Sequence, residues 1–298
     1  MNLQWDDLKI FLAVARSESL SAAGRVLKVD PATVGRRIAR LEEGLETPLF
    51  AKSPQGYAMT DAGQRLLTHA ERAEAAMGAA VEELAGQAGA LSGQIRIGAP
   101  DGCANFLLPQ VCAAIMADNP DLEVQIVALP RVFNLSKREA DMAIGVSPPA
   151  AGRLTVQKIT DYRLHLAASR RYLRRHPAIN TLEDLQGHRM VGYIPDMIFD
   201  KELDYLTGIG VERVALASNS VSVQFNWIRQ GGGVGIVHDF AIPSAKGLVR
   251  LLTDQVSLTR SFYLIRHADD RRMDRLNRFA AALADGIRRE VARLEAEV

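Results

Sequence analysis

Apolar side chains recur every three or four positions in three short stretches of the first sixty residues, which predicts three helices. The first stretch has four such residues, namely Leu8, Phe11, Leu12 and Ala15. The second is expected to begin at Ser21, because a serine hydroxyl can accept a hydrogen bond from a free amide of the first turn. Asp30 and Pro31 predict the start of the third helix, since aspartate caps such amides and proline suits the first helical position.

The third stretch has two chemically different faces. Its apolar side chains form one stripe that should pack on the other helices, namely Val34, Ile38, Leu41 and Leu45. Polar side chains lie on the opposite face, mostly in the first half of the helix, namely Thr33, Arg36, Arg37 and Arg40. Arginine can bond a guanine edge or a phosphate through two N–H groups, and threonine can touch a base edge. An ordinary solvated face is the alternative, but the short helix and tight turn before it favour a recognition helix in the DNA major groove.

Turn-forming residues follow the third stretch, between two short candidate strands at 49–52 and 57–60. The sequence Ser53-Pro54-Gln55-Gly56 predicts the hairpin of a winged helix-turn-helix. Polar side chains there can bond phosphates, with an ordinary exposed hairpin as the alternative. The residues expected to contact DNA are Ser21, Pro31, Ala32, Thr33, Arg36, Arg37, Arg40, Lys52, Ser53 and Gln55.

A long alanine-rich helix is predicted from residue 61 to about residue 91. Apolar side chains step along it by three and four positions and form one seam, namely Leu66, Ala70, Ala73, Met77, Ala80, Leu84, Ala88 and Leu91. A lone helix of this length would leave the seam in water, so pairing with the same helix of a second chain is expected. A dimer would also present two recognition helices to a two-fold related DNA site. Packing of the seam within one chain is the alternative.

The pattern changes after a hinge at residues 90–93, where short apolar runs begin to alternate with helical stretches. Strands are predicted at 94–99, 122–128, 140–146, 163–168, 190–194, 214–218, 235–238 and 261–266, and helices at 105–118, 133–137 and 273–294. This alternation implies a parallel sheet, and the two sets of strands favour two α/β lobes. The predicted domains are a DNA-binding domain at 1–60, a linker helix at 61–91, one lobe at about 92–162 plus 266–298 and a second lobe at about 163–265.

Composition agrees with a multidomain globular protein of 298 residues, with 48% hydrophobic and 24% charged residues. No apolar run reaches the roughly 18 residues of a membrane span, and the N-terminus carries acids where a secretory signal carries bases, so a cytoplasmic protein is expected. The net charge of +1 makes DNA affinity depend on local clusters of basic residues. Cys103 and Cys112 are too few for a disulfide framework and lack metal-ligand spacing, so no metal or other cofactor is expected.

The N-terminal motifs match a known family in order and in spacing. They are Ser21-Ala22-Ala23, the run from Arg36 to Glu43, Pro48-Leu49-Phe50 and Thr60-Asp61-Ala62-Gly63. The chain resembles the LysR-type transcriptional regulators over essentially its whole length, more weakly after residue 91. The resemblance implies a bacterial winged helix-turn-helix regulator, a homo-oligomer that is a dimer or a tetramer, and a two-lobed sensor domain like the type 2 periplasmic binding proteins. Gly35 stands where the family usually has serine, and Glu46 stands where it usually has a turn glycine.

The same resemblance places a small-molecule effector in the cleft between the lobes, as expected for ligands that bind beyond the carboxyl ends of parallel strands. Residues that follow predicted strands are the candidates, namely Pro100, Asp101, Gly102, Cys103, Leu129, Arg131, Ile194, Asp196 and His238. Free amides after residue 100 can hold an anion, whereas Asp101 either caps its own helix or favours a cationic group. An ordinary loop role is the alternative for each residue. Effector binding is expected to favour one closure of the lobes and to change the spacing or bend of bound DNA.

Other functions have weaker support in the sequence. Cys103 at a helix N-terminus is an alternative sensor, of redox state. A nucleotide site at residues 231–235 is excluded, because these glycines precede a strand and do not link a strand to a helix. No nucleophile elbow, metal set or carboxylate pair accompanies His238 and Asp239, so an enzyme is not expected. A solute-binding protein would need a secretory signal, and a DNA-architectural protein without an effector stays an alternative.

Overall fold

The computed structural model describes residues 4–298 apart from 54–55, 85–90, 129–139, 150–151 and 212. The chain divides into two compact units, one built mainly on residues 1–88 and the other mainly on residues 89–298. Across the described residues, no helix combines the length and the apolar character that a membrane crossing needs.

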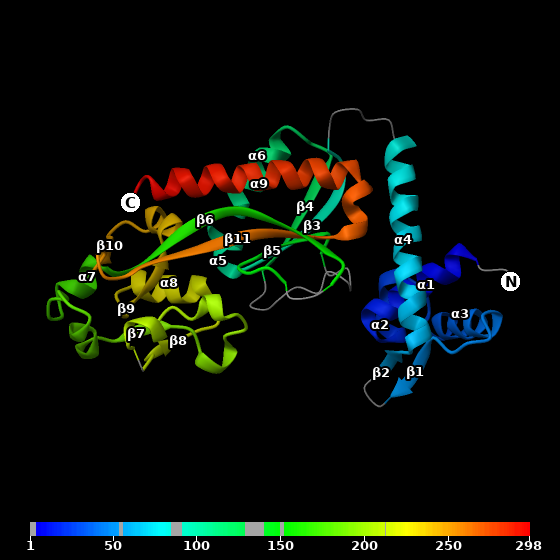
Figure 1. Ribbon diagram of the computed structural model, residues 1–298, viewed down its shortest axis with the longest axis horizontal. Coiled ribbons are helices and arrows are strands. Elements are labelled where there is room, and N and C mark those ends of the chain that lie inside the picture. Colours follow the sequence, from blue (N-terminus) through cyan, green and yellow to red (C-terminus); the bar gives the residue numbers. More distant parts are fainter. Residues whose placement is uncertain (1–3, 54–55, 85–90, 129–139, 150–151, 212) are drawn as a thin grey trace. The chain divides into compact units, whose positions relative to one another are not determined.

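The first unit contains three short helices, a hairpin and one long helix (Figure 1). Its elements are α1 (Trp5–Ser17), α2 (Leu20–Leu27), α3 (Pro31–Gly44), β1 (Phe50–Ser53), β2 (Gly56–Met59) and α4 (Asp61–Leu84). The predicted three helices and wing hairpin are therefore confirmed, with β1 and β2 paired antiparallel. The apolar stripe of α3 is buried as predicted at Val34, Ile38 and Leu41, in one core with Phe11 and Leu49. This core fixes which face of α3 points to solvent.

Side-chain caps set the starts of α2 and α3. The predicted cap at Ser21 is wrong, because the hydroxyl of Ser19 accepts the hydrogen bond from the Ala22 amide at 3.3 Å and α2 begins at Leu20. The predicted cap at Asp30 is confirmed, since its Oδ1 accepts from the Ala32 amide at 2.8 Å and Pro31 is the first residue of α3. No more than three residues separate each capped helix from the helix before it.

The turn after α3 contains the departure from the family pattern noted at residue 46. Glu46 has a positive φ of 50°, a left-handed conformation that glycine adopts at less cost than other residues. This geometry explains why glycine is usual at this turn in the family that the sequence resembles.

The first half of the long helix α4 packs on the rest of the first unit. Leu67 and Ala70 are buried in the core of this unit, whereas Met77 is exposed. One part of the predicted seam therefore packs within the chain, and another part, at Met77, is exposed to solvent in a single chain. The structure describes the helix as far as Leu84, and the predicted extension over 85–90 lies outside the described residues. Leu91 itself is not helical, and its amide donates to Asn119 Oδ1 at 2.6 Å in the second unit. Ala88 of the predicted seam lies outside the described residues.

The second unit is built on one nine-stranded mixed sheet in the order β4-β3-β5-β11-β6-β9-β7-β8, with β10 paired to β6. The strands are β3 (Gly93–Ala99), β4 (Leu122–Ala128), β5 (Met142–Gly145), β6 (Leu154–Ser169), β7 (Met190–Gly192), β8 (Leu216–Ala217), β9 (Val234–His238), β10 (Leu248–Leu251) and β11 (Ser257–His267). Pairing is parallel within the sets β4-β3-β5 and β9-β7-β8, as predicted. The long strands β6 and β11 pair antiparallel with their neighbours, which the prediction of a parallel sheet missed.

Helices cover both sets of strands. The α-helices are α5 (Asp101–Phe106), α6 (Leu108–Ala117), α7 (Arg170–Leu173), α8 (Val221–Arg229) and α9 (Asp274–Glu295), and the 3-10 turns are η2 (Glu183–Gly187), η3 (Pro195–Met197), η4 (Lys201–Leu203), η5 (Thr207–Ile209), η6 (Asp239–Ser244) and η7 (Ala268–Arg272). The prediction of a single helix at 105–118 is wrong, because the helix is interrupted at Leu107, between α5 and α6. The helix predicted at 133–137 lies outside the described residues.

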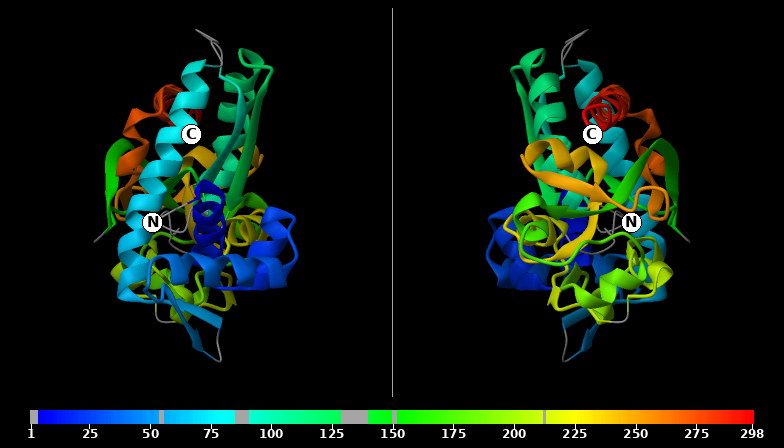
Figure 2. Two further views of the ribbon diagram at one scale, coloured as in Figure 1. Left: turned by 90° about the vertical axis from the view of Figure 1, so that its right-hand side faces the viewer. Right: turned by 90° about the vertical axis from the view of Figure 1, so that its left-hand side faces the viewer.

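The strands β6 and β11 join the two halves of the second unit. One half holds β3, β4 and β5 with α5 and α6, and the other holds β7 to β10 with α7 and α8 (Figure 1). The helix α9 lies along β6 and β11 and packs on α6, where a Cβ on Gly286 would meet Val111 at 2.5 Å (Figure 2). The other end of α9 meets β6, because Glu295 Oε1 accepts from the Arg163 amide at 2.7 Å. The two lobes are therefore linked by two paired strands.

Candidate DNA-binding face and ligand cleft

The exposed face of α3 starts at the Asp30 cap and carries the predicted recognition residues. Pro31, Ala32 and Arg36 are exposed and Thr33 is half-buried. Arg36 Nη2 donates to Thr33 Oγ1 at 2.8 Å, so both side chains lie together over one turn of the helix. Within the described part of the chain Arg36 makes no ion pair, and its guanidinium keeps donors for an outside acceptor. This turn is the part of α3 best suited to touch a base edge.

Arg40 has a different environment from Arg36. Its Nη2 donates to Asp7 Oδ1 at 2.6 Å and to Oδ2 at 2.7 Å, and the Asp7 side chain is only 6% exposed. Arg37 Nη1 lies 3.7 Å from the same Asp7 Oδ1. A buried carboxylate needs such partners, because an unpaired charge in the interior is costly. Arg40 and Arg37 therefore hold α3 against α1, a role that the sequence pattern did not reveal.

The wing hairpin is tied to the helices through its backbone. Glu42 Oε1 of α3 accepts from the amides of Leu49 and Phe50 at 2.6 and 3.0 Å. The amide of Tyr57 donates to the carbonyl oxygen of Glu18, at the end of α1, at 3.0 Å. The hairpin is thus fixed relative to the recognition helix at both of its strands.

The remaining predicted DNA contacts lie on α2 and on the hairpin. Ser21 is exposed on α2. Lys52 and Ser53 belong to β1, and the predicted contact at Gln55 lies outside the described residues. The predicted DNA face therefore combines residues of α2, α3 and β1 within one unit.

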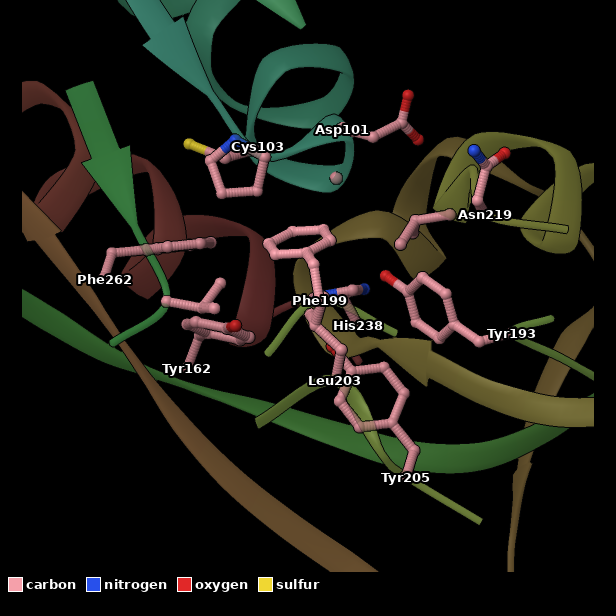
Figure 3. Close-up of a pocket in the computed structure, with 14 residues that line it drawn as sticks. Asp101, Cys103, Tyr162, Tyr193, Phe199, Leu203, Tyr205, Asn219, His238 and Phe262 are labelled. Atoms are coloured by element: carbon pink, nitrogen blue, oxygen red, sulfur yellow. The ribbon is translucent and has the colours of Figure 1, made fainter. Parts of the chain in front are cut away.

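A small cavity lies between the two halves of the second unit, and the space inside it that admits the centre of a water-sized sphere is about 20 Å³ (Figure 3). Residues from both halves and from the two linking strands line it, namely Pro100, Asp101, Gly102, Cys103, Val146, Tyr162, Tyr193, Phe199, Leu203, Tyr205, Asn219, Val221, His238 and Phe262. This space is far below the roughly 300 to 1,000 Å³ of small-molecule sites, so a ligand larger than a water molecule can enter only if the two halves move apart.

The predicted effector residues divide into three groups in the structure. Those brought together at the cavity are Pro100, Asp101, Gly102, Cys103 and His238. Ile194 and Asp196 do not line it, because the chain bends after β7 and presents Tyr193 and Phe199 there instead. Leu129 and Arg131 lie outside the described residues. The candidates at the carboxyl ends of β3 and β9 therefore line the cavity, whereas those that follow β7 do not.

Aromatic rings form most of the cavity wall. Tyr162 of β6 stacks on Phe262 of β11 with centroids 4.1 Å apart, and its centroid lies 5.4 Å from that of His238. Tyr193 meets Tyr205 edge to face at 5.8 Å. Figure 3 shows the hydroxyl of Tyr193 pointing into the cavity. The sequence pattern revealed none of these rings apart from His238, because an aromatic residue inside a predicted strand has the same pattern as a core residue.

Asp101 connects the two lobes across the cavity. Its Oδ2 accepts from the Ser222 amide at 2.7 Å and from the Ser220 hydroxyl at 3.1 Å, both at the start of α8. Its Oδ1 accepts from Asn105 Nδ2 at 3.2 Å. The carboxylate therefore caps the N-terminus of a helix in the other lobe. The sequence had suggested only that Asp101 caps its own helix or favours a cationic group. An anion could reach the amides of α8 only by displacing this carboxylate.

Burial sets the protonation of the other polar groups in the cavity. It lowers the pKa of His238 to about 4, so this imidazole is neutral near pH 7. It raises the pKa of Tyr193 and of Tyr205, so both phenols stay protonated. It also raises the pKa of the fully buried Cys103 thiol, and that of Cys112 to about 11. A buried thiol with a raised pKa is a poor nucleophile, which argues against the redox alternative at Cys103.

Comparison with known proteins gives two family matches and several relatives of similar length. The model for the lysR family of bacterial regulatory helix-turn-helix proteins matches residues 5–64, and the model for the LysR substrate binding domain matches residues 88–288. The HTH-type transcriptional activator TtdR of Escherichia coli (strain K12) is 28% identical over 239 residues, 76% of this chain and 75% of that protein.

Solved structures agree with the fold. Full-length AphB, a virulence activator of Vibrio cholerae, has a TM-score of 0.58 at 23% identity, covering 95% of this chain and 99% of that one. A full-length OxyR variant from Pseudomonas aeruginosa has a TM-score of 0.68 at 18% identity, covering 97% of this chain and 95% of that one. Both likenesses extend over the helix-turn-helix and the two-lobed unit together.

Proposed function

The chain belongs to the LysR family of bacterial transcriptional regulators, and from this premise we propose how its described side chains divide the work of DNA and effector recognition. It is a DNA-binding regulator with an effector-binding domain and not an enzyme. In our proposal the first turns of α3 discriminate bases, the wing holds phosphates, and a small molecule in the cleft between the lobes controls the DNA complex. We propose that it acts in the cytoplasm.

Base discrimination is assigned to Arg36 with Thr33. The observation that supports this assignment is the contrast along one helix face, where Arg36 is exposed without an ion pair in the described chain while Arg40 is tied to Asp7. A guanidinium already anchored by a buried carboxylate can still approach a phosphate, but it cannot turn freely to a guanine edge. Residues proposed to position the protein on the DNA backbone are Arg37, Arg40, Ser21, Lys52, Ser53 and Gln55.

A homodimer is proposed to form through the second half of α4. Met77 is 52% exposed there and Ala80 is exposed, although both continue the apolar spacing of the buried first half. Two chains paired along this surface would present two recognition helices to one palindromic site. Assembly of two dimers into a tetramer is the larger form of the proposed oligomer.

Control by the effector is proposed to act through lobe closure. The Asp101 carboxylate bonds the N-terminus of α8 across the cleft, so the closed arrangement has a contact that an open one lacks. A ligand that favours one arrangement shifts the population of lobe closures, and β6 and β11 transmit the change to α9. The proposed consequence is a changed spacing or bend at the operator.

Quantitative footprinting tests the assignment of base reading. Arg36→Ala is expected to weaken operator binding by about 10- to 100-fold and to leave binding to random DNA nearly unchanged. Lys52→Ala is expected to weaken both DNAs alike and to lower the salt slope by about one. Arg289→Ala, an exposed arginine on α9, is the control and should change neither. Equal losses on operator and random DNA for Arg36→Ala would refute the assignment and favour an architectural DNA-binding protein.

A further inference from the structure

We propose that the cleft, when its two halves move apart to admit a ligand, is selective for a small organic cation, an amine or a quaternary ammonium, with the Asp101 carboxylate as counter-charge and the surrounding rings as its walls. The inference names the ligand class for the cleft of the proposed function and rests on that function for its regulatory meaning. Ligand binding is measured on the protein without DNA, so the proposed ligand class and the proposed regulatory function can be refuted separately.

The charge of the cavity supports a cation. Among the described residues that line it, Asp101 is the one with a formal charge at neutral pH. His238 adds no positive charge, since burial lowers its pKa to about 4. The phenols add no negative charge, because burial raises the pKa of Tyr193 and of Tyr205. In a site of low dielectric this single carboxylate favours a cation strongly and opposes an anion by a similar amount.

The hydrogen bonds of Asp101 preserve its charge. They come from the Ser222 amide, the Ser220 hydroxyl and the Asn105 amide group, all of them neutral donors. In the described part of the chain Asp101 makes no ion pair with a lysine or arginine. Its Oδ1 accepts one bond, at 3.2 Å, and so has room for a further donor. The carboxylate is therefore held in place without being neutralised.

The rings supply the second half of cation recognition. Aromatic faces carry negative potential and attract ammonium groups within about 6 Å of the ring centroid. Phe199 is 36% exposed, and Figure 3 places its ring at the centre of the group of side chains that line the cavity. The hydroxyl of Tyr205 is buried and has no hydrogen-bond partner among the described residues. It is thus available to accept a hydrogen bond from an ammonium or a ligand hydroxyl.

Ligands of similar shape and different charge test the proposal on the full-length protein. Choline is compared by calorimetry with its neutral isostere 3,3-dimethylbutan-1-ol and with the anion 3,3-dimethylbutanoate, and n-butylammonium is compared with 1-butanol. Each cation is expected to bind at least 10-fold more tightly than its neutral counterpart, and the anion should give no measurable heat. Equal or tighter binding of the alcohol or the butanoate would overturn the proposal, as would the absence of binding by both cations at millimolar concentration.

A conservative variant separates the charge from the fold. Asp101→Asn keeps an oxygen acceptor for the Ser222 amide and removes the charge, so the preference for choline over the alcohol should fall to within about 2-fold. Asp118→Asn removes an exposed acid at the end of α6 and should keep the full preference. A preference that survives in Asp101→Asn would overturn the role of this carboxylate. Operator footprints of the ligand-free variants report on DNA binding independently, so a failure of the regulator function is visible as a lost footprint and not as lost ligand selectivity.

Discussion

The recognition helix and the ligand cleft present their functional groups in opposite ways. Thr33 and Arg36 come from one turn of α3, and the charged Arg36 side chain faces solvent. The cleft gathers residues from Pro100 to Phe262, and its wall is mostly buried and uncharged. An exposed helix face can change its side chains with little effect on folding, whereas a buried wall serves the core and the ligand together. Function and stability are therefore separable at Thr33 and Arg36 and coupled in the cleft.

The largest expected effect is a loss of folding stability when one glycine in each region is replaced by alanine, which adds a single methyl group. A Cβ on Gly63 would lie 2.2 Å from the carbonyl oxygen of Leu49 in the first unit, and a Cβ on Gly233 would lie 2.2 Å from that of Arg189 in the second. Backbone cannot yield as a side chain can, so each alanine variant should lose about 3 kcal/mol or more in its own unit. Gly44→Ala, with nothing within 4 Å, should be neutral or up to about 1 kcal/mol more stable.

The two tryptophans allow these losses to be assigned. Trp5 lies in α1 and Trp227 in α8, so variants that retain one of them report urea unfolding of one unit. Gly63→Ala should lower the midpoint seen by Trp5 and abolish operator binding while the Trp227 signal keeps its midpoint. Equal shifts of both signals would show that the two units unfold together and that the damage is not confined to one region.

The next effect is a pH dependence confined to the second unit. The folded-state pKa of His238 is about 4 against an ordinary value of 6.5, so the unfolded chain binds more protons between these values. The stability associated with His238 is fully present above pH 6.5 and falls as the pH drops toward 4, by at most about 1.4 kcal/mol per pH unit. Unfolding followed by Trp227 should show this slope, and His238→Phe, which keeps the ring beside Tyr162, should flatten it. An unchanged slope in His238→Phe would assign the titration to other groups.

The sequence predicted α3 and its faces well because the relevant contacts are local. A cap, a proline and a period of three to four positions lie within about fifteen residues, and together they determine the helix and its buried stripe. The error at Ser21 was also local, since Ser19 is an equally good cap and the pattern alone could not choose between them. The ion pair from Asp7 to Arg40 spans 33 positions, and no periodicity within one helix predicts it.

The cleft could be predicted in part from the ends of strands. Asp101 follows the end of β3 by two positions and His238 ends β9, and ligands of open α/β sheets bind beyond the carboxyl ends of the strands. Tyr162 and Phe262 lie inside β6 and β11, so their position at the cavity follows from the antiparallel pairing of these strands across both lobes. That pairing joins residues that are distant in the sequence. Its register depends on the tertiary fold, and the sequence pattern of either strand does not contain it.

A smaller effect separates the two arginines of α3. Arg40→Ala would leave Asp7 buried with Arg37 as a weaker partner at 3.7 Å, so it should destabilise the first unit by about 1 to 2 kcal/mol. Arg36→Ala should leave the stability reported by Trp5 within about 0.5 kcal/mol, since its side chain is exposed. The double variant Asp7→Asn/Arg40→Ala should recover part of the loss, because the unpaired charge is removed. Equal stability of the two single variants would contradict the anchoring role of Arg40.

The last expected effect concerns the chemical reactivity of the thiol at the cleft, which leaves the stability of both units unchanged. Cys103 is fully buried and burial raises its pKa, so very little thiolate forms at pH 8 and none of it faces solvent. Native protein treated with iodoacetamide should be alkylated at Cys103 and Cys112 at least about 100-fold more slowly than protein unfolded in urea. Mass spectrometry of the modified peptides measures the two sites separately, with the unfolded protein as the control for intrinsic reactivity. Rapid modification of native Cys103 would show that water and reagent enter the cleft readily, and the contrast between an open recognition face and a closed ligand wall would then be lost, together with the case against redox sensing.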